Sequence, residues 1–132
     1  MKVVITDGGR SKYFKGKDVG DCVTRALALA TGIDYKEVYD TIKNITGKTP
    51  RNGVSKKDTS KVMEHYGFKW TPLMKIGAGC TVHLTESELP SGTIICSVSK
   101  HVVCVKDGVI YDAFDPQRNG TRCVYGYWVK GI

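Results

Sequence analysis

Two strand-like runs joined by the dipeptide Asp107-Gly108 constrain the fold of this chain more than any other feature. The runs cover residues 101–106 and 109–114 and are rich in valine, isoleucine and aromatic residues. Asp-Gly between two such runs is a strong signal for a β-hairpin with a two-residue turn. That turn pairs Lys106 with Val109, so the register of the whole hairpin follows from the turn.

Helical patterns come first along the chain, and most strand patterns come last. Helices are predicted over residues 22–30, over residues 34–43, and from Ser55 or Thr59 to Tyr66. Strands are predicted over residues 1–5, 68–71, 93–98, 101–106, 109–114 and 122–129. This order is typical of an α+β fold with a helical layer and a layer of antiparallel strands. No repeat, linker or low-complexity segment interrupts it, so we expect one domain over residues 1–132.

The stretch from Gly20 to Ala30 has the pattern of a buried helix with a cysteine in its first turn. Apolar residues recur at i, i+3, i+4 and i+7 from Val23 onward, and Gly32 is placed to end the helix. Asp21 is predicted to be the N-cap, its carboxylate accepting a backbone N–H. Cys22 then lies where the helix dipole favours a negative charge and therefore a thiolate. Taken alone, a buried and inert role explains a free cysteine better.

A nucleophilic cysteine needs a base, and the base needs an orienting group. His101 opens the first hairpin strand, and in the predicted register Asp112 shares its face on the diagonal, about 7–8 Å away at Cα. Asp115 has the opposite parity unless a bulge intervenes, which favours a role in the turn. His65 and His83 have no acid nearby on a predicted strand, so we assign both to surface or core packing.

The order Cys22, His101, Asp112 resembles that of the papain-like cysteine peptidase superfamily. Three segments are similar to small phage-encoded members of it: DCVTRALALATGIDYKEVYD, ELPSGTIICSVSKHVVCVKDGVIYDAFDP and VYGYW. The resemblance covers most of the chain. It implies a papain-like fold in which the Cys-bearing helix packs on the C-terminal antiparallel sheet. It also implies that Cys22 is the nucleophile, His101 the base and Asp112 the third member of a catalytic triad.

The chain departs from this superfamily at the oxyanion hole. Many papain-like enzymes carry a glutamine a few residues before the cysteine, but residues 15–21 contain neither glutamine nor asparagine. The backbone N–H of Cys22 is then expected to be one donor, and Lys17 or another N–H of this loop the second. A missing donor costs about 10²–10³ in rate, so weak activity or a different acyl chemistry stays open.

Arg25 lies three residues after Cys22, so it projects near the same face of the helix. It could bind a carboxylate of a substrate, or it could pair with an acid of the chain such as Asp21. We favour the structural pairing, since guanidinium groups suit buried ion pairs with carboxylates.

The five cysteines are an odd number, and no two of them have the CxxC spacing of a zinc site. Charge appears too early at the N-terminus for a signal peptide, and no apolar run is long enough to span a membrane. We therefore expect a cytoplasmic protein, in the host cytoplasm if it is phage-encoded, without disulfides.

The formal net charge is +7, which raises the prospect of an acidic partner, although a solvated basic surface is the favoured explanation of the charge by itself. No motif for groove entry or base stacking accompanies it, so nucleic acid is not the favoured partner. A membrane partner is not expected either.

The function predicted from these residues is hydrolysis of a peptide, isopeptide or amide bond through Cys22, His101 and Asp112, without cofactor or metal. The expected substrate is a protein or peptide, with a preference for acidic ones. One alternative is an acyltransferase on the same triad, and another is a catalytically silent phage-type protein that binds and inhibits a host factor. A nucleic-acid-binding protein is the least favoured alternative and predicts affinity that falls steeply with salt.

Overall fold

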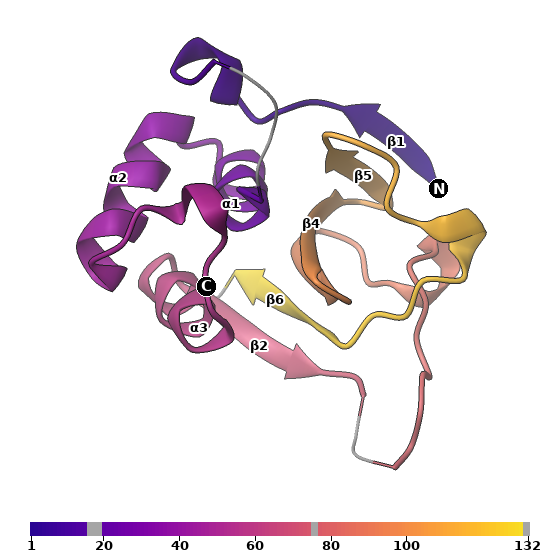
Figure 1. Ribbon diagram of the computed structural model, residues 1–132. Coiled ribbons are helices and arrows are strands. Elements are labelled where there is room, and N and C mark those ends of the chain that lie inside the picture. Colours follow the sequence, from indigo (N-terminus) through magenta and orange to yellow (C-terminus); the bar gives the residue numbers. More distant parts are fainter. Residues whose placement is uncertain (16–19, 75–76, 131–132) are drawn as a thin grey trace.

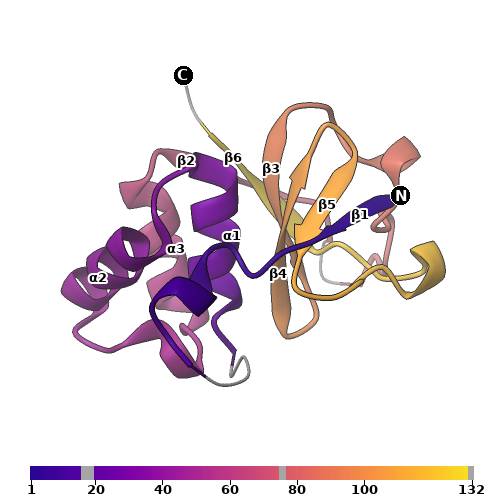
Figure 2. The same ribbon diagram turned by 90° about the horizontal axis from the view of Figure 1, so that it is seen from above.

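The computed structural model describes residues 1–15, 20–74 and 77–130. Within these ranges the chain forms the α-helices α1 (Cys22–Thr31), α2 (Tyr35–Thr46) and α3 (Lys56–His65). Short 3-10 helices are η1 (Arg10–Lys12), η2 (Pro50–Asn52), η3 (Glu86–Glu88) and η4 (Arg118–Gly120). The α-helices gather on one side of the molecule and the sheet lies on the other (Figure 1 and Figure 2). No α-helix among the described residues could cross a membrane.

The strands form one six-stranded sheet in the order β1-β5-β4-β3-β6-β2. Their bounds are β1 (Lys2–Ile5), β2 (Phe68–Pro72), β3 (Thr93–Val98), β4 (His101–Lys106), β5 (Val109–Asp112) and β6 (Gly126–Lys130). The α+β prediction is confirmed, but the expectation of a purely antiparallel, C-terminal sheet is wrong. β1 pairs with β5 in parallel, and β2 comes from the middle of the chain. The segment between β1 and β5 contains all three α-helices, a crossover long enough for parallel pairing.

The predicted hairpin register is confirmed. Lys106 pairs with Val109, and Cys104 pairs with Tyr111. Strand β5 ends at Asp112, two residues earlier than predicted, so the pairing of His101 with Phe114 is replaced by a contact between their rings, whose centroids are 5.1 Å apart. The tight turn thus places the side chains of His101 and Asp112 together at one end of the sheet.

Helix α1 lies against the middle of the sheet, chiefly against β4. Its residues Val23, Ala26 and Leu27 are buried in the core between the helices and the sheet, as their spacing predicts. A second apolar cluster, which includes Leu84 and Ile110, covers the opposite face of the sheet. This packing fixes α1 along its length. Cys22, the first residue of α1, therefore lies near His101, the first residue of β4.

Local capping chemistry sets the start of α3 and the end of α2. Ser55 caps α3 through the N–H of Asp58, which decides between the two predicted starts of that helix. Helix α2 continues to Thr46, beyond its predicted end, and stops at Gly47 with φ 75°. Glycine adopts this left-handed conformation without steric cost, which makes it a common helix stop.

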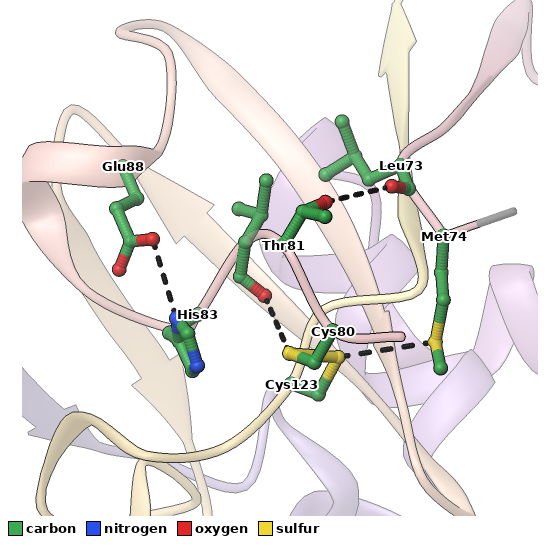
Figure 3. Close-up of a disulfide and its surroundings, with 8 residues drawn as sticks. Leu73, Met74, Cys80, Thr81, His83, Glu88 and Cys123 are labelled. Carbon is green, nitrogen blue, oxygen red and sulfur yellow. Dashed lines mark hydrogen bonds and ion pairs between the residues drawn. A yellow bond between two sulfur atoms is a disulfide. The ribbon is translucent and has the colours of Figure 1, made fainter. Parts of the chain in front are cut away.

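A disulfide joins Cys80 to Cys123, which contradicts the expectation of a chain without disulfides. The bridge connects the segment after β2 to the segment before β6. The Cα atoms of the two cysteines are 5.8 Å apart. Figure 3 shows the bridge beside Met74, with His83 and Glu88 nearby. The sequence could not indicate this pair because the two residues are 43 positions apart and lack any motif.

Thiol titration checks this bridge. In denaturant without reductant we expect three reactive thiols, from Cys22, Cys96 and Cys104, and five after reduction. The Cys123→Ser variant should show four thiols in both conditions, since its partner Cys80 is then free. Five thiols in the unreduced wild-type protein would contradict the disulfide.

Candidate active site

A cleft of about 860 Å³ opens between the helical layer and the sheet. One wall comes from the start of α1, the segment before α3 and one face of α3, and the other from β2, β3, β4 and β6. Cys22 lies on the helical wall and His101 on the sheet wall. Two secondary-structure layers therefore bring together the two residues that the sequence predicts as nucleophile and base.

His101 makes a short hydrogen bond to the carboxylate predicted to orient it. Its Nε2 atom lies 2.6 Å from Oδ2 of Asp112, and the two side chains are 9% and 2% exposed. The imidazole also interacts with the half-buried Cys22. Because Nε2 is engaged with Asp112, Nδ1 is the ring nitrogen that remains for the thiol. Asp112 does not line the cleft, so it contacts His101 on the side of the ring that faces away from the cleft.

The surroundings of His101 favour its charged form. Burial of the ring lowers its pKa, but the hydrogen bond to Asp112, the interaction with Cys22 and their charges outweigh burial and raise the pKa to about 9. The hydrogen bonds and charges around the ring thus favour an imidazolium that faces Cys22.

This shift has a consequence for stability. The pKa of His101 rises from 6.5 to about 9 on folding, so its stabilisation is complete below about pH 6.5 and is lost as the pH rises through 9. Between pH 6 and pH 10 we expect the free energy of unfolding of the wild-type protein to fall by roughly 3 kcal/mol more than that of His101→Gln. Urea titrations of both proteins measure this difference. Equal pH dependence would show that His101 is not stabilised as a cation.

Asp112 is held in turn by a buried ion-pair network. Nη2 of Arg25 lies 3.2 Å from its Oδ1, and Arg25 is 3% exposed. The same guanidinium donates to Asp21, whose carboxylate also accepts a 2.5 Å hydrogen bond from the Tyr35 hydroxyl. Arg25 therefore joins the residue before Cys22 to the acid behind His101, and the predicted structural pairing of Arg25 is confirmed.

The predicted side-chain cap of α1 is wrong. Asp21 occupies the N-cap position, but its carboxylate makes no cap hydrogen bond. It is 1% exposed and pairs with Arg25, with Tyr35 and, at 3.7 Å, with Nε of Arg10. Bonds to charged donors are stronger than a bond to one backbone N–H, which explains the choice. Arg10 and Tyr35 carry no sequence signal for this role because they reach Asp21 through tertiary packing.

Asp115 is not part of the site. It is exposed and accepts hydrogen bonds from the backbone and side chain of Gln117, as expected for a turn residue. His65 is exposed and stacks edge-on against Tyr66, while His83 pairs with Glu88 at the surface. In the structure, therefore, Asp112 and not Asp115 meets His101, and neither His65 nor His83 lines the cleft.

An indole forms part of the cleft surface that the sequence did not indicate. Trp70 of β2 is 44% exposed, and its ring centroid lies 4.5 Å from that of Trp128. The Trp70 ring lies over Gly126, where a Cβ atom would approach it within 2.4 Å. Glycine at position 126 therefore leaves the room that the Trp70 ring occupies beside the strand, and Trp70 lines the cleft.

Lys17, predicted as a second oxyanion donor, lies outside the described residues. Among the residues that are described, no cluster of histidine, cysteine or acidic side chains is arranged to hold a metal ion.

No family model, curated protein or solved structure matches this chain. The likeness to papain-like peptidases accordingly stays a prediction from the sequence. What the site can do is judged from its own geometry.

Proposed function

We propose that this chain is a cysteine-dependent hydrolase that cleaves a peptide, isopeptide or amide bond. The observation that carries the proposal is the meeting of Cys22 and His101 across one cleft, with Asp112 bonded to the far side of the imidazole. A thiol, a base and a buried acid in this order are the parts of nucleophilic acyl transfer.

In the proposed reaction, Nδ1 of His101 takes the proton of Cys22, and the thiolate attacks the carbonyl carbon of the substrate. The backbone N–H of Cys22, in the first turn of α1, is the proposed donor to the oxyanion. His101 then donates its proton to the nitrogen as the C–N bond breaks, which releases the amine and leaves a thioester. Water, deprotonated by His101, attacks the thioester, releases the acid and restores the thiol. Asp112 stabilises the imidazolium each time it forms.

A papain-like architecture is part of what we propose. A Cys-bearing helix packed on a sheet that supplies the histidine and the acid supports a papain-like architecture, and the sequence resemblance supports a phage-encoded origin. A cytoplasmic location is also proposed. The Cys80–Cys123 disulfide weighs against that location because cytosolic thiols are normally kept reduced.

Site-resolved alkylation by iodoacetamide tests the proposal. At pH 6 we expect Cys22 to react at least about ten times faster than Cys96 or Cys104. The latter two are internal controls, because burial raises the pKa of each to about 12. Peptide mass spectrometry of timed samples gives the rate at each position.

Slow alkylation of Cys22 that rises only above pH 8 would overturn the nucleophile assignment and favour a silent binding protein. In that case Cys22→Ala should keep the biological effect. If Cys22 is reactive and product formation requires an added amine, the chain is instead an acyltransferase.

A further inference from the structure

Lysines surround the cleft that holds Cys22 and His101. Lys56 opens α3 on the helical wall, Lys100 directly precedes His101 on the sheet wall, and Lys69 lies on β2. Glu64 of α3 is the acidic residue among the described residues that line the cleft. Leaving His101 aside, the charged lining residues therefore carry an excess of positive charge.

Within the part of the chain that the structure describes, no ion pair explains the placement of these lysines. All three are exposed, and none is in an ion pair with a carboxylate of the described residues. Three lysines line the described part of the cleft against one acid, Glu64. Much of the remaining cleft surface is apolar, including Trp70 and Val102. Charges of one sign on apolar walls concentrate the electric field in a cleft.

Lys100 occupies a turn that does not favour lysine. It lies in the two-residue connection between β3 and β4, where its φ is 56°. Non-glycine residues adopt this left-handed conformation at a cost, and asparagine tolerates it better than lysine. The chain thus holds an ammonium group next to His101 at a position where backbone geometry alone favours another residue.

We propose that the cleft binds acidic polypeptides, with substrate carboxylates held by Lys56 and Lys100 on either side of the reacting carbonyl. This inference rests on the proposed function, which supplies the reason for a polypeptide: a thiolate attacks a carbonyl carbon, and a nucleic-acid backbone has none. Lysines on both walls let acidic side chains pair on both sides of the cleft.

Alkylation with a charged and a neutral reagent tests this inference apart from the nucleophile. We would measure the rate of alkylation of Cys22 at pH 8.5 with iodoacetate, which is negatively charged, and with iodoacetamide, which is neutral. The quantity compared is the iodoacetate rate divided by the iodoacetamide rate. Lys100→Asn, which suits the turn, and Lys56→Gln should each lower the ratio by about two- to five-fold, and Glu64→Gln should raise it. Lys61→Gln is the matched control, because Lys61 is exposed on α3 but does not line the cleft.

The iodoacetate-to-iodoacetamide ratio in the wild-type protein should also fall as salt rises from 20 to 200 mM, since screening shortens the reach of these charges to about 7 Å. Ratios unchanged in both cleft lysine variants would overturn the inference while leaving the nucleophile intact. A weak iodoacetamide reaction at pH 6 would instead count against the proposed function, and the ratio at pH 8.5 would still report on the lysines.

Protection of Cys22 identifies the class of ligand. A glutamate-rich peptide should slow its alkylation by iodoacetamide, and the matched glutamine peptide should not. Equal protection by the two peptides, or protection by oligothymidylate as strong as that by the acidic peptide, would overturn the assignment to acidic polypeptides.

Discussion

Replacing Arg25 with methionine is expected to lower the free energy of unfolding by about 3–5 kcal/mol. The guanidinium is buried and pairs with both Asp21 and Asp112. Methionine fills a similar volume, so the loss reflects buried carboxylates deprived of their cation more than a cavity. Urea unfolding at pH 7 measures the change.

Lys36→Met is the matched control for this prediction. Lys36 also pairs with an acid, Asp40, at 2.6 Å, but the two side chains are 43% and 52% exposed. Exposed pairs on a helix contribute little, so we expect a change within about 0.5 kcal/mol. A loss in Arg25→Met as small as that in Lys36→Met would show that the buried network does not stabilise the fold.

His101→Ala is expected to slow alkylation of Cys22 at pH 6 by roughly 5- to 20-fold. An ordinary thiol with a pKa near 8.5 is thiolate to only about 0.3% at pH 6, so a stable ion pair multiplies the reactive form several hundred-fold. Part of that gain is lost because a less basic thiolate is a weaker nucleophile, with a Brønsted coefficient of about 0.4–0.5. Rates across pH 5–9 should show the wild-type plateau at low pH and its absence in the variant.

His65→Ala is the control, because His65 is exposed on α3 and does not line the cleft. It should leave the rate at Cys22 unchanged. Above pH 9 the wild-type and His101→Ala rates should converge, since any accessible thiol is then largely ionised. Equal rates for both proteins at pH 6 would exclude an ion pair between Cys22 and His101.

The contacts of the β4–β5 hairpin could be predicted from the sequence alone. Asp107-Gly108 sets the pairing of Lys106 with Val109, and the alternation of side chains then places Asp112 beside His101. These contacts are local in sequence, so turn chemistry and a period of two residues are enough to predict them. The position of Cys22 at the start of α1 is local in the same sense, since helix periodicity and Gly32 define that element.

The features that the sequence could not supply depend on residues far apart in the chain. Asp21 leaves its cap role because Arg25 and Tyr35 surround it in the folded core. The parallel pairing of β1 with β5 and the bridge from Cys80 to Cys123 likewise join distant segments.

The approximate positions of the α-helices and strands, the hairpin register and the candidate site residues could thus be predicted from local patterns. Tertiary structure decided which charges those residues meet and that Cys22 and His101 share one cleft. The physical reason is that hydrogen bonds of turns and helices act over a few residues, whereas buried ion pairs and packing are chosen only when distant segments come together.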